Sequence, residues 1–159
     1  MNNAIFVDTW AFRALADAAD PGHAAARDLD VRLRAAGVER ITSDYVLDEA
    51  LTGIRARSGP RVASRFWDEI EALSDGKLLR VERITEARFR RAGAFFKRLN
   101  GKLPRLSFTD CTSFVLMIEE RVAWAFTADD HFDKVGNGLH APFDLASDGR
   151  LRASPLPFA

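Results

Sequence analysis

Short apolar runs alternate along the chain with longer segments in which apolar residues recur every three or four positions. The short runs are typical of buried strands, and the longer pattern is typical of helices that pack one face against a core. Strands separated by helices favour a mainly parallel sheet covered by helices on both faces. The expected strands are 4–7, 38–42, 78–81, 122–126 and one around 141–145, and the expected helices are 10–15, 20–36, 44–57, 60–73, 85–99, 111–118 and 130–135.

Capping residues mark several of the expected helix ends. Asp20-Pro21 predicts the start of the second helix, and Gly37 predicts its end. Ser107 and Asp110 stand three residues apart before a late apolar segment. They resemble a capping box in which Asp replaces the usual Glu or Gln, so we expect a helix to begin there.

Length and composition predict one globular domain over residues 1–159. The chain has 159 residues, of which 47% are hydrophobic, and it contains no repeat or low-complexity linker. Charges interrupt every apolar stretch well before the roughly 20 residues needed to cross a bilayer, and the N-terminus lacks the pattern of a signal peptide. A lone Cys111 in an apolar run reads as a core residue. We therefore expect a cytoplasmic protein without a membrane span.

The formal net charge is zero, which excludes attraction of phosphate by a globally basic protein. Any binding of nucleic acid must therefore be local. The positive charge is carried mostly by arginine, whose planar fork suits phosphate and carboxylate alike. A solvated surface encoded by a GC-rich gene explains the same bias equally well.

Three acidic residues fall where an α/β fold brings chemistry together. Asp8 and Asp129 follow apolar strands, and Asp110 stands at a helix start. Ligands of parallel sheets bind beyond the carboxyl ends of the strands, so these side chains can converge. Clustered carboxylates repel one another unless a cation neutralises them, and hard oxygen ligands suit Mg²⁺ or Mn²⁺. Such an ion can activate water for hydrolysis of a phosphodiester.

Four motifs, in this order, resemble those of PIN-domain ribonucleases, and most closely the toxins of the VapC type. The similarity spans roughly residues 5–132, and Asp20-Pro21-Gly22-His23-Ala24 also looks like an early segment of those toxins. The motifs are Phe6-Val7-Asp8-Thr9, Val46-Leu47-Asp48-Glu49, Leu106-Ser107-Phe108-Thr109-Asp110 and Phe126-Thr127-Ala128-Asp129-Asp130-His131-Phe132.

The resemblance implies a fold, an activity and a set of partners. The fold is a PIN-like three-layer α/β/α arrangement, and the activity is Mg²⁺- or Mn²⁺-dependent endonuclease cleavage of RNA. The partners are the RNA substrate, a cognate VapB-like antitoxin and a second copy of the chain in a homodimer. The resemblance assigns Asp8 and Asp110 as principal metal ligands, Glu49 as a supporting acid and Asp129 as the fourth acid. Thr9 and Thr127 are expected to hydrogen-bond to these acids.

Each of these acids also has an ordinary structural explanation. Asp8 can be a turn acid, Asp110 a helix cap, and Glu49 a solvated residue paired with a nearby arginine. Asp129 and Asp130 compete for the fourth position, and we choose Asp129 because its spacing before His131 matches the family. For His131 a turn or cap residue is the favoured interpretation, and the alternative is contact with RNA or assistance in proton transfer.

Other functions fit the sequence less well. An aspartyl phosphatase usually needs a second Asp two positions after the first, where this chain has Trp10. A receiver domain needs an acidic pair near its first strand, and this sequence has none there. The serious alternative is a PIN-fold module that binds RNA or protein without cleaving, against which the presence of all four acids argues.

Two features depart from a compact PIN toxin. Trp10 stands where relatives often carry a smaller polar residue, and residues 144–159 are expected to form a C-terminal extension.

The early helices carry more large hydrophobic residues than one core obviously needs. Some of them are expected to line a dimer or antitoxin groove, although burial in the core is favoured for each residue taken alone. They are Trp10, Phe12, Leu15, Phe66 and Trp67.

Overall fold

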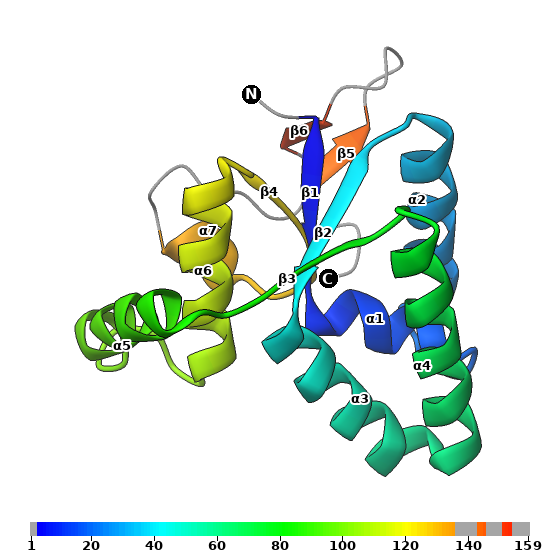
Figure 1. Ribbon diagram of the computed structural model, residues 1–159, viewed down its shortest axis with the longest axis horizontal. Coiled ribbons are helices and arrows are strands. Elements are labelled where there is room, and N and C mark those ends of the chain that lie inside the picture. The colour runs from blue at the N-terminus through cyan, green and yellow to red at the C-terminus, as the bar shows by residue number, and fades with distance from the viewer. Residues whose placement is uncertain (1–2, 136–142, 146–150, 154–159) are drawn as a thin grey trace.

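A computed structural model describes residues 3–135, 143–145 and 151–153, and it shows a parallel sheet at the centre of the molecule (Figure 1). Four strands lie in the order β3-β2-β1-β4, and each neighbouring pair runs parallel. All the carboxyl ends of these strands therefore meet at one edge. The strands are β1 (Ala4–Val7), β2 (Glu39–Ser43), β3 (Arg80–Glu82) and β4 (Trp124–Phe126).

Helices cover both faces of the sheet, which confirms the expected three-layer arrangement. In Figure 1, α2 and α4 lie on one side, α6 and α7 lie on the other, and α5 packs outside α6. Helices α1 and α3 lead away from the carboxyl ends of β1 and β2. None of the described helices is long and apolar enough to span a membrane. The helices are α1 (Thr9–Ala16), α2 (His23–Ala35), α3 (Asp44–Ser58), α4 (Pro60–Asp75), α5 (Glu86–Leu99), α6 (Phe108–Glu120) and α7 (His131–Lys134).

The core forms around β1 and α6, two segments with long continuous runs of buried residues. All four residues of β1 are buried, and every residue from Cys111 to Met117 in α6 is buried as well. Phe114 of α6 meets Phe132 of α7 edge to face, with ring centroids 5.2 Å apart. Burial also raises the pKa of the Cys111 thiol to about 11. Cys111 is thus an inert core residue, as expected.

Most of the expected elements are confirmed, but the start of α2 is not. Gly37 follows α2 with φ of +65°, a conformation that glycine adopts at a helix end without strain. At the other end, the expected start at Asp20-Pro21 is wrong. Asp20 Oδ1 accepts the backbone N–H of Gly22 at 2.8 Å, and its carbonyl accepts that of His23 at 3.0 Å. Asp20 therefore closes a turn, and the helix begins only at His23.

A small antiparallel sheet follows the main one. Strands β5 (Phe143–Leu145) and β6 (Leu151–Ala153) pair with each other, and β5 contacts β4. The strand expected around 141–145 is confirmed for the part that is described, whereas β6 was not expected. The remainder of the expected extension at 144–159 lies outside the described residues.

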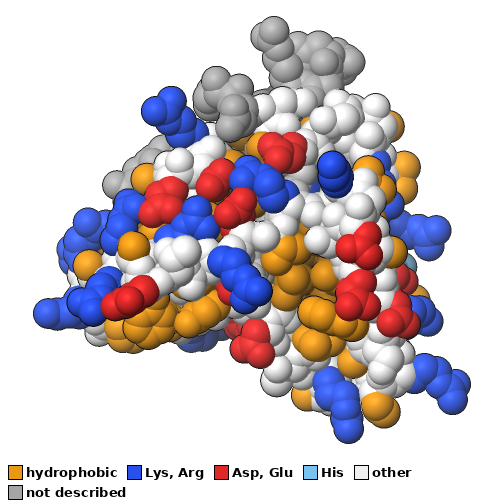
Figure 2. Space-filling model, viewed as in Figure 1, with side chains coloured by type: hydrophobic (Ala, Val, Ile, Leu, Met, Phe, Trp, Pro, Cys, Tyr) orange, Lys and Arg blue, Asp and Glu red, His pale blue; other side chains and the backbone are white. Residues whose placement is uncertain are grey.

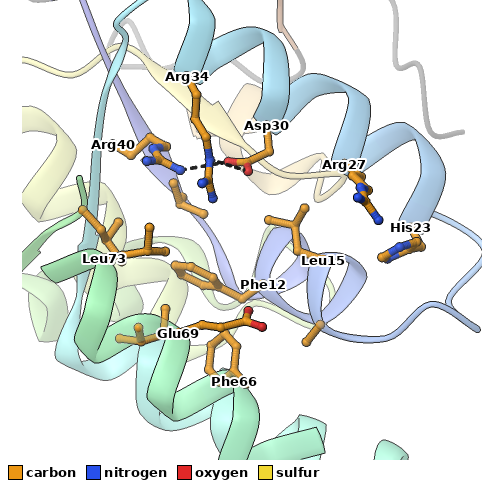
Figure 3. A pocket seen from close by; sticks show the side chains of 14 residues that line it. Phe12, Leu15, His23, Arg27, Asp30, Arg34, Arg40, Phe66, Glu69 and Leu73 are labelled. Atoms are coloured by element: carbon orange, nitrogen blue, oxygen red, sulfur yellow. Dashed lines mark hydrogen bonds and ion pairs between the residues drawn. The ribbon is translucent and has the colours of Figure 1, made fainter. Parts of the chain in front are cut away.

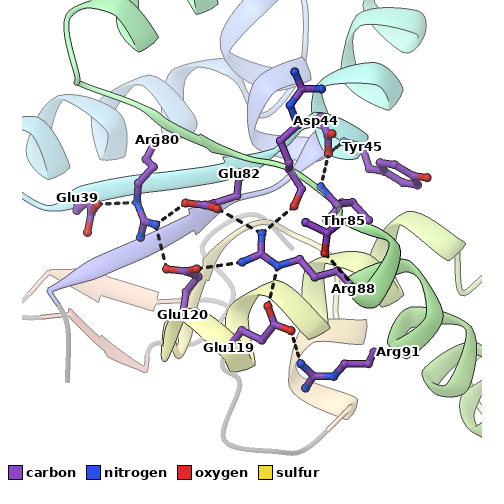
Figure 4. A network of polar contacts seen from close by, with 12 residues as sticks. Glu39, Asp44, Tyr45, Arg80, Glu82, Thr85, Arg88, Arg91, Glu119 and Glu120 are labelled. Carbon is purple, nitrogen blue, oxygen red and sulfur yellow. Dashed lines mark hydrogen bonds and ion pairs between the residues drawn. The ribbon is translucent and has the colours of Figure 1, made fainter.

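A network of charged side chains joins the sheet to the α5–α6 pair (Figure 4). Arg88 of α5 donates to Glu82 of β3 at 3.3 Å, and to Glu119 and Glu120 of α6 at 2.6 and 3.1 Å. Arg80 of β3 donates to Glu82 and Glu120 as well. Figure 2 shows acidic and basic side chains interspersed over this side of the molecule. The two arginines neutralise carboxylates from β3 and α6, so they hold β3, α5 and α6 together.

Arg88→Met tests whether this network stabilises the fold. The Arg88 side chain is only 13% exposed, and its loss removes one partner from each of Glu82, Glu119 and Glu120, which still pair with Arg80 or Arg91. We expect the free energy of unfolding to fall by about 2–3 kcal/mol, measured by chemical denaturation. The control is Arg90→Met, which removes an ion pair to Glu86 whose two side chains are each 78% exposed. Such pairs contribute about 0.3–0.5 kcal/mol, so similar losses in both variants would contradict the role given to Arg88.

Candidate metal centre

The four predicted acids come from four elements around the carboxyl edge of the sheet. Asp8 follows β1 and precedes α1, and Asp129 follows β4. Glu49 lies in the second turn of α3, and Asp110 lies in the first turn of α6. Because the strands are parallel, residues distant in sequence meet at this edge.

Asp8 is a carboxylate buried between β1 and β4. It is 5% exposed, and its Oδ2 accepts the hydroxyl of Thr127 at 2.8 Å. Burial raises the pKa of Asp8 from 3.8 to about 7, because the hydrogen bond from Thr127 only partly offsets the loss of water and the charges of Asp110 and Asp129 add repulsion. At neutral pH this acid therefore lacks the positive partner that would hold it ionised.

Asp110 caps α6 and also lies in a group of potential metal ligands with Asp129 and His131, here called the acid cluster. The expected capping box is confirmed: Asp110 Oδ2 accepts the Ser107 N–H at 2.9 Å, and Ser107 Oγ accepts the Asp110 N–H at 3.0 Å. Within the described part of the chain, no hydrogen bond engages the other oxygen, Oδ1. Burial raises the pKa of Asp110 in spite of the bonds to Ser107. One carboxylate can thus cap α6 with Oδ2 and offer Oδ1 to a cation.

Asp129, and not Asp130, lies in the same cluster. Asp129 Oδ1 accepts the backbone N–H of His131 at 2.9 Å and lies 3.0 Å from His131 Nδ1. Asp130 instead pairs with Lys134 at the surface. Potential ligand atoms of Asp110, Asp129 and His131 all lie within 4.8 Å of one another.

His131 belongs to this group, although its sequence position indicated an ordinary turn or cap. Its Nε2 lies 2.7 Å from the carbonyl oxygen of Pro104, which can only accept, so Nε2 carries the proton. Its Nδ1 faces Asp129 and Asp110. Burial alone would lower the pKa of His131, but Asp129, the bond to Pro104 and Asp110 together raise it. Metal-binding histidines characteristically donate their other N–H in this way.

Glu49 stands beside the cluster and not within it. Its Oε2 accepts the hydroxyl of Thr9 at 3.2 Å, and the side chain is half-buried. The hydrogen bonds expected from Thr9 and Thr127 to the acids are therefore both present. The site as a whole presents several carboxylate oxygens and one imidazole, and its buried Asp8 is destabilised as an anion. These groups fit a divalent cation such as Mg²⁺ or Mn²⁺.

Asp8→Asn tests whether Asp8 is under strain when no metal is bound. The folded chain holds the Asp8 proton up to about pH 7, whereas the unfolded chain releases it near 3.8, so folding takes up a proton between these values. In EDTA, wild-type stability should fall as the pH rises from 5 to 8. Asn keeps the acceptor for Thr127 without the charge, so the variant should melt higher at pH 8 by about 2–4 °C for each kcal/mol of strain relieved.

The matched control is Asp130→Asn, which removes an exposed acid of the same type. Its hydrogen bond to Lys134 lowers the pKa of Asp130, so its removal should not raise the melting temperature. Equal melting curves for wild type and Asp8→Asn across this pH range would show that Asp8 is not strained.

Comparison with known proteins places this site in a family. The PIN domain family model matches residues 5–138. Two curated proteins from Mycobacterium tuberculosis strains, both named 23S rRNA-specific endonuclease VapC20, are 32% identical to the chain over 133 residues, covering 83% of it and 94% of their own length. A crystal structure of Mycobacterium tuberculosis VapC20, described as a toxin that cleaves the sarcin-ricin loop, matches with a TM-score of 0.70 at 31% identity over 83% of this chain and 95% of that one. The chain therefore belongs to the PIN-domain family, as a member of the VapC type.

Proposed function

We propose that this VapC-type endoribonuclease cleaves RNA with a divalent metal ion held by Asp8, Asp110 and Asp129, supported by Glu49. The observation that carries the proposal is the convergence of Asp110, Asp129 and His131 within 4.8 Å, beside a buried Asp8 with a pKa of about 7. Clustered carboxylates of this kind are stable as anions only with a cation among them. Mg²⁺ is proposed as the ion, with Mn²⁺ as a substitute.

The residues of the chain have distinct parts in this proposal. A bound cation would supply an activated water and neutralise charge on the phosphodiester. The Thr127 hydroxyl holds Asp8 in place, and the capping box holds Asp110. Glu49, oriented by Thr9, is placed to accept a hydrogen bond from water. In the hydrolysis, the water oxygen bonds to phosphorus, the bond to the leaving ribose oxygen breaks, and the leaving oxygen takes up a proton.

Asp8→Asn and Asp110→Asn test the proposed activity. Removal of a metal ligand should lower the cleavage rate by more than about 100-fold, since even residues that only orient ligands contribute about 10–100-fold. EDTA should abolish cleavage by the wild type, and Mn²⁺ or Mg²⁺ should restore it. The two similar proteins are named for cleavage of 23S rRNA, so an RNA with the sarcin-ricin loop is the first substrate to assay.

Asp130→Asn serves as the control, because Asp130 is exposed and paired with Lys134 outside the cluster. It should cleave as the wild type does. RNA binding without metal-dependent cleavage by the wild type would favour the alternative of a non-catalytic PIN-fold binding module. Full activity in Asp8→Asn would refute the assignment of Asp8.

A pocket between α1, α2 and α4 supports the proposal of an antitoxin partner (Figure 3). Phe12 and Phe66 pack edge to face at 5.6 Å and form its apolar floor together with Leu15. Burial of these two phenylalanines is the ordinary outcome expected for each, whereas Trp67 remains 42% exposed. Arg27 of α2 lies at the pocket and forms no ion pair within the described residues. An antitoxin segment with an apolar side chain and a nearby carboxylate would fit here.

Arg27→Glu tests this placement. If a carboxylate of the antitoxin pairs with Arg27, reversal of the charge should reduce co-purification with the protein encoded by the adjacent gene by about tenfold. RNA cleavage by the isolated variant should be unchanged. Arg61→Glu makes the same charge reversal on an exposed residue at the start of α4, and should leave co-purification unchanged. If both variants retain the adjacent-gene protein equally, the antitoxin binds elsewhere on the chain. If the wild type co-purifies with no adjacent-gene protein, the toxin–antitoxin proposal is contradicted.

The proposed homodimer has a separate source of support. Phe89 and Phe96 of α5 are 48% and 36% exposed, and both rings lie against Phe108 at the start of α6. Exposed aromatic residues gathered in one place are typical of protein interfaces. We therefore propose that the outer face of α5 meets a second copy of the chain.

A further inference from the structure

Arg13 of α1 is a cation without a partner in the protein. Its side chain is half-buried, and its Nε is shielded from solvent yet donates no hydrogen bond. Across residues 3–135, 143–145 and 151–153, no oxygen accepts a hydrogen bond from its guanidinium. A buried donor without an acceptor costs free energy, and such a group in a folded protein requires an explanation.

Gly53 of α3 leaves the space that this guanidinium occupies. A Cβ atom at position 53 would lie 2.5 Å from Arg13 Nη2 and 2.6 Å from its Nε, so only glycine allows Arg13 to lie against α3. Glycine inside a helix is less favourable than alanine. Glycine at position 53 therefore makes α3 less stable than alanine would. The guanidinium for which it leaves space forms no hydrogen bond with the described residues.

The Arg13–Gly53 contact lies one helical turn beyond the Thr9–Glu49 hydrogen bond, which borders the candidate metal centre. Thr9 of α1 bonds to Glu49 of α3, and Arg13 and Gly53 each stand four residues further along the same two helices. One turn advances about 5.4 Å. The guanidinium of Arg13 therefore lies against the turn of α3 that directly follows Glu49.

We propose that Arg13 binds a backbone phosphate of the RNA beside the acid cluster. The inference rests on the proposed function only in taking RNA as the ligand. The two terminal Nη groups of an arginine can bind phosphate oxygens with two parallel hydrogen bonds, and partial burial strengthens such a charge-assisted contact. Arg13 supplies a local positive charge at the site of a chain whose net charge is zero. It is a substrate-positioning residue on the wall between α1 and α3.

The experiment measures binding of a labelled RNA stem–loop by fluorescence anisotropy over a range of KCl concentrations, with Ca²⁺ present and intact RNA verified on a gel. Arg13→Met should weaken binding about tenfold at low salt. The slope of log affinity against log salt should fall by about 0.7–0.9, as expected for the loss of one phosphate contact. A purely structural role for Arg13 would lower the melting temperature and leave the slope unchanged.

Gly53→Ala provides a second variant that does not threaten the fold. The new methyl group displaces the flexible end of Arg13, and alanine favours the helix, so the melting temperature should stay equal or rise. RNA affinity and the salt slope should nevertheless fall as in Arg13→Met. The double variant should bind no more weakly than Arg13→Met alone, because both changes remove the same contact.

Arg61→Met is the control, since Arg61 is an exposed arginine of α4 and takes no part in the Arg13–Gly53 contact between α1 and α3. It should keep wild-type affinity and slope. Wild-type binding and slope in Arg13→Met and Gly53→Ala would overturn the inference, as would a wild type that binds no RNA. A wild type that binds RNA in this Arg13-dependent way but cleaves none with Mn²⁺ would refute the proposed activity and leave the phosphate contact standing.

Discussion

The repulsion between carboxylates at the carboxyl edge of the sheet is the constraint on which the candidate site depends. Parallel strands bring Asp8 and Asp129 to one edge, and α6 adds Asp110. The protein answers this repulsion only in part, with the Thr127 hydroxyl, the Ser107 amide and the His131 ring. Each of these groups orients an acid without neutralising the cluster fully. The fold thus contains an unfavourable electrostatic interaction that the proposed cation would relieve.

Much of the fold follows from patterns local in sequence. The run Ala4–Val7 is apolar throughout and becomes a fully buried strand, and the spacing of Ser107 and Asp110 gives the capping box as expected. The start of α2 was mispredicted because the Asp20 side chain can bond to either a turn or a helix, and the choice depends on its surroundings. Trp10 lies against Gly22, where a Cβ would come within 2.7 Å of the ring, a contact that no local pattern reveals.

The site was predictable as a set of acids but not as a geometry. Order along the chain identified Asp8, Glu49, Asp110 and Asp129 as candidates. It did not show that Asp110 and Asp129 form the tightest group with His131, while Asp8 and Glu49 stand beside it. His131 was missed because a histidine in a turn is common, and its contact with the Pro104 carbonyl spans 27 residues. The two-residue spacing from Asp129 to His131 was the available signal. Arg13 and Gly53 carry no such signal, because their relation exists only once α1 and α3 are packed together.

The double use of Asp110 affects how this protein can lose its activity during evolution. An apolar substitution at Asp110 removes a proposed metal ligand and also the acceptor of the Ser107 N–H, so it weakens the start of the most buried helix. At Asp8 such a substitution removes an acceptor of the Thr127 hydroxyl, but it also relieves the burial of a charge and the repulsion from Asp110 and Asp129. If selection favours cells with a disabled nuclease, surviving inactive alleles should accumulate changes at Asp8 that leave a stable protein, whereas changes at Asp110 should more often be lost to degradation.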